Sequence, residues 1–180
     1  MNKIFSIFLI SLISSVSAQI DVTKYANNRE ALQRMLDSAM VSSYFINTAD
    51  AATILQKPVF LKDSSYKYAS GVLRFTFNYV AKYVDTTSKG ALFFGYEQFK
   101  DSISAKDIYA FIKTQTTKTT VLTALQNIGD EGYFQINERN EPFIIIRKGN
   151  RVFKFGVTYL TEKDCLIQLI TLAKKICIRY

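Results

Sequence analysis

Hydrophobic and polar residues alternate with a period of two in three segments of the chain. They are residues 73–79, 91–97 and 152–160. Successive side chains of a strand point to opposite faces, so this alternation predicts strands that bury one face and expose the other. We expect 73–79 and 91–97 to be paired strands.

Two further segments, 133–137 and 142–148, complete an antiparallel meander with 152–160. Gly149-Asn150 marks the tight turn between the last two strands, because both residues tolerate the positive φ that hairpin turns need. The second strand is apolar on both faces from Phe143 to Ile146. This pattern is typical of a strand in the middle of a sheet.

The remaining extended pieces are shorter. We expect a short strand at 59–61, a polar loop at 62–69 and a turn region at 82–89. Residues 121–128 predict a short strand or one turn of helix.

Three segments carry apolar residues at the spacing of an amphipathic helix. They are residues 49–56, residues 105–113 and the segment after Asp164. Pro58 ends the first helix. The β-branched residues of 114–120 favour extended chain and therefore predict the end of the second helix.

The expected helix starts have recognisable caps. Thr48 is the predicted N-cap of the first helix. Ser104–Asp107 and Thr161–Asp164 have the form of capping boxes, with aspartate in place of glutamate.

Residues 1–18 have the parts of a cleavable secretory signal: one positive charge, a short apolar run and small residues at the end. The apolar run is roughly half of the ~20 residues that a membrane-spanning helix needs. We therefore expect an exported protein, periplasmic or extracellular, with no transmembrane segment after the signal is removed. We expect residues 19–47 to be a partly helical N-terminal segment, in which Asn28 could cap a helix.

Residues 48–180 predict one domain of the α+β class, with a twisted antiparallel sheet and helices packed on one face. Each of the first two helices precedes a group of strands, so the layout allows a duplicated helix-plus-strands unit. The residues of the two groups are too different for a sequence repeat.

The formal net charge is +8, and the basic residues are scattered along the chain. Scattered charge is typical of a solvated surface and does not predict a nucleic-acid partner. The expected partner is a protein or a component of the cell envelope.

Cys165 and Cys177 are 12 residues apart in one predicted helix. At about 1.5 Å per residue they lie roughly 18 Å apart, whereas a disulfide needs Cα atoms within about 7 Å. We expect free thiols, with Cys165 in the core and Cys177 near a loose end.

The chain contains no histidine, which removes the commonest general base and most zinc and copper sites. No glycine-rich phosphate loop or dinucleotide motif is present. We expect no cofactor, no metal site and no catalytic residue.

The candidate ligand-binding residues are three cations near one hairpin, Arg147, Lys148 and Arg151, and two strand tyrosines, Tyr79 and Tyr96. Arg147 and Lys148 are neighbours in a strand, so we expect them to point to opposite faces.

An alternative function uses carboxylates. The candidates would be Glu97, Asp130, Glu131 and Glu138. Asp130 and Glu131 are adjacent in extended chain and should diverge, which favours a structural turn with Asp130 bound to local amides.

Several landmarks occur in a characteristic order: 49–59 ending in Gln56-Lys57-Pro58-Val59, Tyr96–Phe99, Gly129–Phe134 and Ile146–Asn150, followed by an amphipathic helix. In this order the chain resembles small exported bacterial domains of unknown function, seen as secreted proteins or lipoproteins, with LGKPV-like, GDEAYF-like and VRKGN-like motifs. Gln56 and Gly132 depart from that pattern. The resemblance implies an envelope or extracellular domain and assigns no catalytic residue.

These observations predict a non-enzymatic secreted or periplasmic binding module. One alternative is a carboxylate-dependent hydrolase of cell-envelope polymers. Another is an accessory subunit that docks on a partner through residues 20–47.

Overall fold

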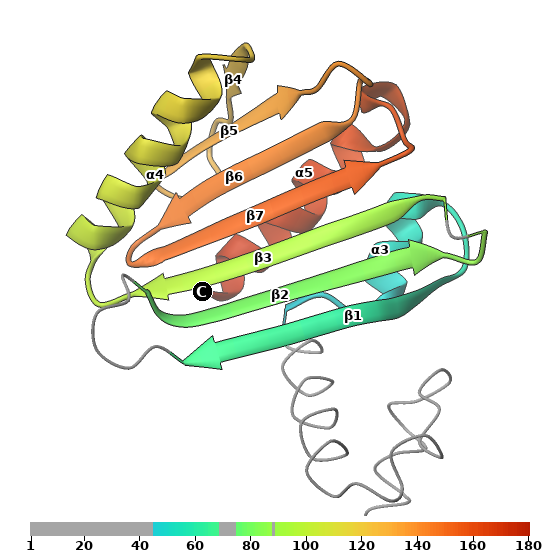
Figure 1. Cartoon of the computed structure of the whole chain (residues 1–180), viewed down its shortest axis with the longest axis horizontal. Coiled ribbons are helices and arrows are strands. Elements are labelled where there is room, and N and C mark those ends of the chain that lie inside the picture. The colour runs from blue at the N-terminus through green and yellow to red at the C-terminus, as the bar shows by residue number, and fades with distance from the viewer. Residues whose placement is uncertain (1–44, 69–74, 88) are drawn as a thin grey trace, which may run out of the picture. The chain divides into compact units, whose positions relative to one another are not determined.

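The structure is a computed structural model that describes residues 45–68, 75–87 and 89–180. Within this part of the chain, one antiparallel sheet of seven strands packs against three helices (Figure 1). The predicted signal segment and the predicted helix after Asn28 lie outside the described residues. The elements are α3 (Thr48–Leu55), β1 (Val59–Tyr68), β2 (Phe75–Asp85), β3 (Ala91–Phe99), α4 (Ser102–Thr117), β4 (Leu122–Ala124), β5 (Glu131–Ile136), β6 (Pro142–Lys148), β7 (Arg151–Thr158) and α5 (Glu162–Arg179).

The sheet consists of two antiparallel meanders joined edge to edge. β1, β2 and β3 form one meander and β5, β6 and β7 the other, and β3 pairs with β7. The strand order is β1-β2-β3-β7-β6-β5-β4. The predicted α+β class with an antiparallel sheet is therefore confirmed, and β6 lies inside the sheet as its apolar residues predicted.

One face of the sheet carries the main core. The register places Tyr79, Tyr96, Phe153 and Ile146 directly opposite one another on successive strands, so they share this face. α3 and α5 lie behind the sheet on that side (Figure 1). The residues of α5 that become buried form a stripe at helical spacing: Cys165, Leu169, Leu172, Ala173, Ile176 and Cys177.

α4 packs against the opposite face. Ala105 and Tyr109 lie in a cluster with Tyr133, Ile145 and Val152, which alternate with the residues of the main core along their strands. The expected packing of helices on one face thus describes α3 and α5, while α4 covers part of the second face.

The predicted duplication of a helix-plus-strands unit holds for the order of the strands and fails for the helices. Each meander follows a helix, but α3 and α4 lie on different faces of the sheet. A repeat of helix and strands together would place both helices on equivalent faces.

The helix caps differ from the prediction at two of three positions. α3 has Asn47 as its N-cap, with a capping box to Asp50, so Thr48 was the wrong residue. α4 starts after Asp101, whose side chain accepts from the Ser104 amide at 2.8 Å. Asparagine and aspartate are among the strongest N-cap residues. Asn47 stands one position before the predicted cap Thr48, and Asp101 stands three positions before the predicted cap Ser104. The capping box of Thr161 and Asp164 is confirmed.

The predicted loop at 62–69 and the first half of the predicted turn region at 82–89 were wrong, because residues 62–68 and 82–85 belong to long strands. β1 runs to Tyr68 and β2 to Asp85, and the two pair along nearly their whole length. β1 is the edge strand, and Lys62, Asp63 and Ser65 are exposed there, so it lacks apolar alternation. The helix α4 also continues through the threonine-rich segment to Thr117. The Thr116 hydroxyl donates to the Ile112 carbonyl at 2.9 Å, which satisfies the polar group within the helix.

Replacement of Gly156 tests the packing between β7 and β6. A Cβ at Gly156 would lie 2.6 Å from Cδ2 of the Phe143 ring, whereas a Cβ at Gly95 would come no closer than 3.4 Å to Lys154. We expect Gly156→Ala to lower the free energy of unfolding by about 1–3 kcal/mol, because the ring must move. The matched Gly95→Ala variant should change it by less than about 0.5 kcal/mol. Urea unfolding measures both, and equal losses would contradict this packing.

Candidate functional site

Two of the candidate residues, Tyr79 and Tyr96, belong to the core. Their exposed fractions are 0% and 3%. The Phe45 ring lies 5.4 Å from the Tyr79 ring and 4.6 Å from the Tyr96 ring, and the Tyr180 ring stacks on Phe45 at 5.2 Å. Burial raises the pKa of Tyr96, although the nearby Arg151 guanidinium opposes the shift. Tyr79 and Tyr96 therefore pack with Phe45 and Tyr180 in the core. Neither tyrosine contributes to a ligand-binding surface.

Lys148 and Arg151 fasten the end of α5 to the sheet. The Lys148 ammonium donates to the carbonyl of Cys177, and the Arg151 guanidinium donates to the backbone oxygen of Tyr180. Cations at a helix C-terminus satisfy carbonyls that have no partner inside the helix. Both side chains therefore stabilise the contact between the end of α5 and the face of the sheet that α5 covers.

Arg147 lies on the other face, as the alternation predicted, and binds two carboxylates. Its Nη1 donates to Asp130 at 2.8 Å, and its Nε donates to Glu131 at 3.0 Å. Asp130 also accepts from the Gly149 amide at 2.8 Å. The side chain of Arg147 is only 11% exposed.

The expectation that Asp130 and Glu131 diverge was wrong. Glu131 is the first residue of β5 and lies directly opposite Arg147, whereas Asp130 precedes the strand and is free of its alternation. The two carboxylates therefore converge on one guanidinium. The structural interpretation of this turn gains support, because Asp130 bonds to an amide of the neighbouring hairpin.

Replacement of Arg147 tests this ion pair. Arg147→Met leaves two adjacent carboxylates without their cation, so we expect the free energy of unfolding to fall by about 2 kcal/mol, less than for a fully buried pair. Arg139→Met, in an exposed turn, should change it by less than about 0.5 kcal/mol. Urea unfolding compares the two variants. A loss for Arg147→Met no larger than that for Arg139→Met would show that the cluster adds nothing to stability.

Two buried carboxylates escaped the sequence analysis. Asp85 is 3% exposed and accepts from the Thr87 hydroxyl at 2.6 Å and the Gly90 amide at 2.9 Å. The Thr87 hydroxyl is the main cause of its lowered pKa; burial opposes the shift, and the backbone amides of Gly90, Thr87 and Lys89 add to it. Asp85 thus closes the hairpin between β2 and β3. Its place after an apolar strand and before Thr86-Thr87 was the available signal.

Glu141 plays a similar part before β6. Its carboxylate accepts from the Asn137 amide side chain at 2.8 Å and from the Tyr159 backbone N–H at 2.7 Å. Burial alone would raise its pKa, but these hydrogen bonds hold the pKa below the ordinary value. Both groups stay ionised and bound to the backbone, which makes them structural.

The cysteines are free and buried. Burial raises the pKa of each thiol to about 11, so both remain protonated near neutral pH and are poor nucleophiles. Cys165 lies in the core as predicted. The placement of Cys177 near a loose end was wrong, because α5 continues to Arg179 and Cys177 is 3% exposed.

The carboxylate candidates do not form a catalytic pair in the described structure. Glu97 accepts from Lys154 at 2.9 Å, and Asp130 and Glu131 are bound to Arg147. Glu138 lies exposed in the turn between β5 and β6. Each of the first three is thus matched by a cation.

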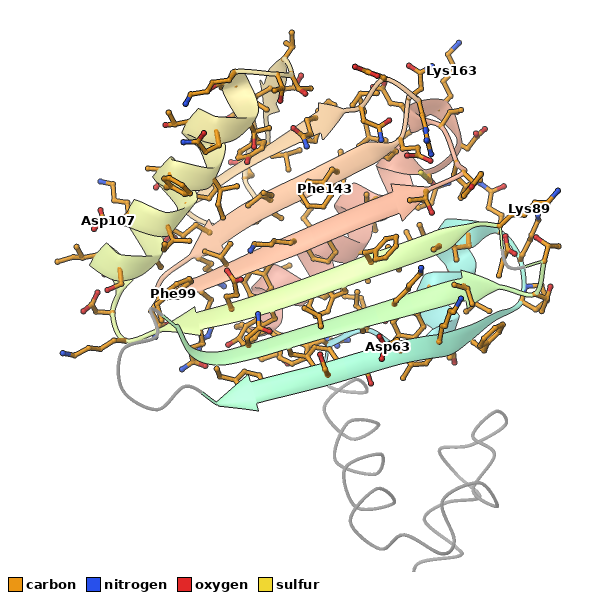
Figure 2. The ribbon with its side chains drawn as sticks, in the orientation of Figure 1. Asp63, Lys89, Phe99, Asp107, Phe143 and Lys163 are labelled. Atoms are coloured by element: carbon orange, nitrogen blue, oxygen red, sulfur yellow. The ribbon has the colours of Figure 1, made fainter. Side chains whose placement is uncertain are left out.

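The second face of the sheet is left partly uncovered. α4 packs against β4, β5, β6, the start of β7 and the end of β3, and no described helix lies over the remainder (Figure 1). Figure 2 shows Phe143 at the boundary, in front of the sheet. We call the uncovered part the open face. Its residues include Asp63, Ser65, Asn78, Val80, Lys82, Phe93, Gly95, Glu97 and Lys154.

The open face combines apolar side chains with paired charges. Val80 is 42% and Phe93 37% exposed, although both lie in the interior strands β2 and β3. The Lys82 ammonium lies 4.8 Å from the centre of the Phe93 ring. Lys154 and Glu97 form an ion pair on the same surface. Sequence analysis missed this site, because alternation shows which residues share a face but not which face a helix covers.

Within the described ranges, no helix is long and apolar enough to cross a membrane. Among the same residues, no three Cys, Asp or Glu side chains come together in a group that could hold a metal ion.

No protein-family model matches the chain, and no curated protein matches it. Among solved structures, the extracellular domain of PknH from Mycobacterium tuberculosis is similar in fold, with a TM-score of 0.52 and 9% sequence identity. The match covers 77% of this chain and 93% of that chain. At this identity the likeness concerns the fold alone. The resemblance to small exported bacterial domains stays a prediction.

Proposed function

We propose that this protein is an exported, non-enzymatic binding module that acts outside the cytoplasm, in the periplasm or beyond the cell. The signal-like residues 1–18 support export. The similarity in fold to an extracellular domain is compatible with this location. The predicted relationship to small exported bacterial domains points the same way.

The observation that carries the proposal is the open face itself. A sheet normally buries its apolar side chains beneath a second layer, yet Val80 and Phe93 are exposed on interior strands. Contiguous exposed apolar patches that are rimmed by polar groups mark binding surfaces in soluble proteins. Val80 and Phe93 are diagonal neighbours across β2 and β3. Lys82, Glu97 and Lys154 supply the charged groups here.

A binding function also fits the state of the carboxylates and thiols that a catalytic function would use. Of the four candidate carboxylates, Glu97 is held by Lys154, and Asp130 and Glu131 are held by Arg147. The two thiols are protonated and buried. The open face offers contacts without reactive side chains.

The test is binding of the purified protein to an envelope preparation from its own host. We expect the double variant Val80→Asp/Phe93→Asp to lose at least about tenfold in affinity, because two charges replace the exposed apolar contacts. The matched control is Ile167→Asp on α5, where an isoleucine is 77% exposed away from the open face. It should bind like the unchanged protein.

Sedimentation of the envelope with bound protein measures the affinity, and circular dichroism checks that each variant is folded. Equal binding by the double variant and the unchanged protein would overturn the proposal. Loss of binding in the α5 control alone would move the binding surface to the other side of the sheet.

A further inference from the structure

We infer that the outer edge of β1 pairs with β1 of a second copy of this chain. The two strands run antiparallel, so the dimer has one continuous sheet with a twofold axis between its halves. This inference goes beyond the proposed function, because it concerns the edge of the sheet and a different partner. Three features carry it: the length of the edge strand, the place of its bulge and the order of its charged residues.

β1 is a long edge strand. It stands at one end of the strand order, and β2 is its partner strand within the described part of the chain (Figure 1). β1 has 10 residues, whereas β4, at the other edge, has 3. An edge strand directs alternate N–H and C=O groups away from its neighbour, and these groups are a template for another strand. β1 therefore offers the longer of the two edges.

The bulge of β1 limits which part of the strand can pair. The register with β2 shifts between Leu61 and Asp63 and is regular from Asp63 to Tyr68. Bulges and lysines at an edge hinder pairing with arbitrary strands. The interface is therefore the regular segment, and its partner must satisfy the charges of that segment. Each copy has one such edge, so the association closes as a dimer.

The regular segment is complementary in charge to itself. When two copies pair antiparallel about Ser65, the register sets Asp63 of each copy directly opposite Lys67 of the other. Pairing about Asp63 or about Lys67 would instead set like charges opposite each other. Opposite charges at directly opposite positions stabilise an antiparallel pair, and like charges destabilise it. The sequence therefore favours a second copy of β1 and selects one register.

The dimer also brings the two open faces together. Asp63 and Ser65 lie directly opposite Lys82 and Val80 of their own chain, so these positions share the open face. Directly opposite residues of antiparallel strands point to the same side of a sheet. Pairing about Ser65 therefore puts the open faces of both copies on one side of the joined sheet.

Sedimentation velocity of the purified protein, at concentrations up to about 1 mM, tests the inference, because even a weak contact is populated there. We expect a monomer–dimer equilibrium. Asp63→Lys sets two lysines opposite each other, and Lys67→Asp sets two aspartates. Each variant alone should lower the association constant at least about tenfold. An equimolar mixture of the two variants should restore the dimer, because every lysine then lies opposite an aspartate.

The matched control is Asp107→Lys, which makes the same change of charge at an exposed position of α4. It should leave the equilibrium unchanged, and circular dichroism checks that each variant is folded. Restoration of the dimer in the mixture is a second check, since unfolded chains would not restore it.

Three results would overturn the inference: a monomer at every concentration, a dimer that the two β1 variants do not weaken, or a mixture that stays monomeric. A dimer that is lost in Val80→Asp/Phe93→Asp and kept in the β1 variants would place the contact on the open face instead. Envelope binding that depends on Val80 and Phe93 in a protein that stays monomeric would leave the proposed function standing and reject the dimer.

Discussion

The burial of α5 against the middle of the sheet is the interaction on which the rest of the structure depends. Its stripe, which includes Leu169, Ala173 and Ile176, has exposed fractions of 0% at these three positions. Burial of such side chains contributes roughly 1.5–3 kcal/mol for each large one, so this stripe is a substantial source of hydrophobic stabilisation. Once α5 and α3 occupy one face, α4 alone remains for the other. The described helices cover only part of that face, and the open face is the consequence.

The charged residues near the hairpin of β6 and β7 support the same arrangement. Lys148 and Arg151 hold the end of α5, while Arg147 holds the turn before β5 through Asp130 and Glu131. Neighbours in sequence thus serve opposite faces of the sheet. A cluster of cations in a sequence would indicate an anion site only if the strand brought the cations to one face. Here the alternation of β6 places Arg147 on one face and Lys148 on the other, where Arg151 also lies.

Much of the fold could be predicted from the sequence, because its longest elements have a clear period. The strands at 91–97 and 142–148 and the helix after Asp164 emerged where the pattern placed them. The edge strand β1 did not, since a strand with one solvated side and one neighbour needs no apolar alternation. The site could not be predicted for a different reason. Tyr79 and Phe93 both look like strand aromatics in the sequence, but the helices decide which of them is covered.

The central claim is that the two faces of the sheet differ in their cover. Val80 and Ala81 are neighbours in β2, with exposed fractions of 42% and 5%. The two native thiols are buried, which gives a low background for labelling. The direct measurement is the rate of thiol modification in Val80→Cys and Ala81→Cys under native conditions. Fast modification at position 80 and protection at position 81 is the result predicted here. Equal protection at both positions would contradict the account, because it would mean that the second face is covered as well.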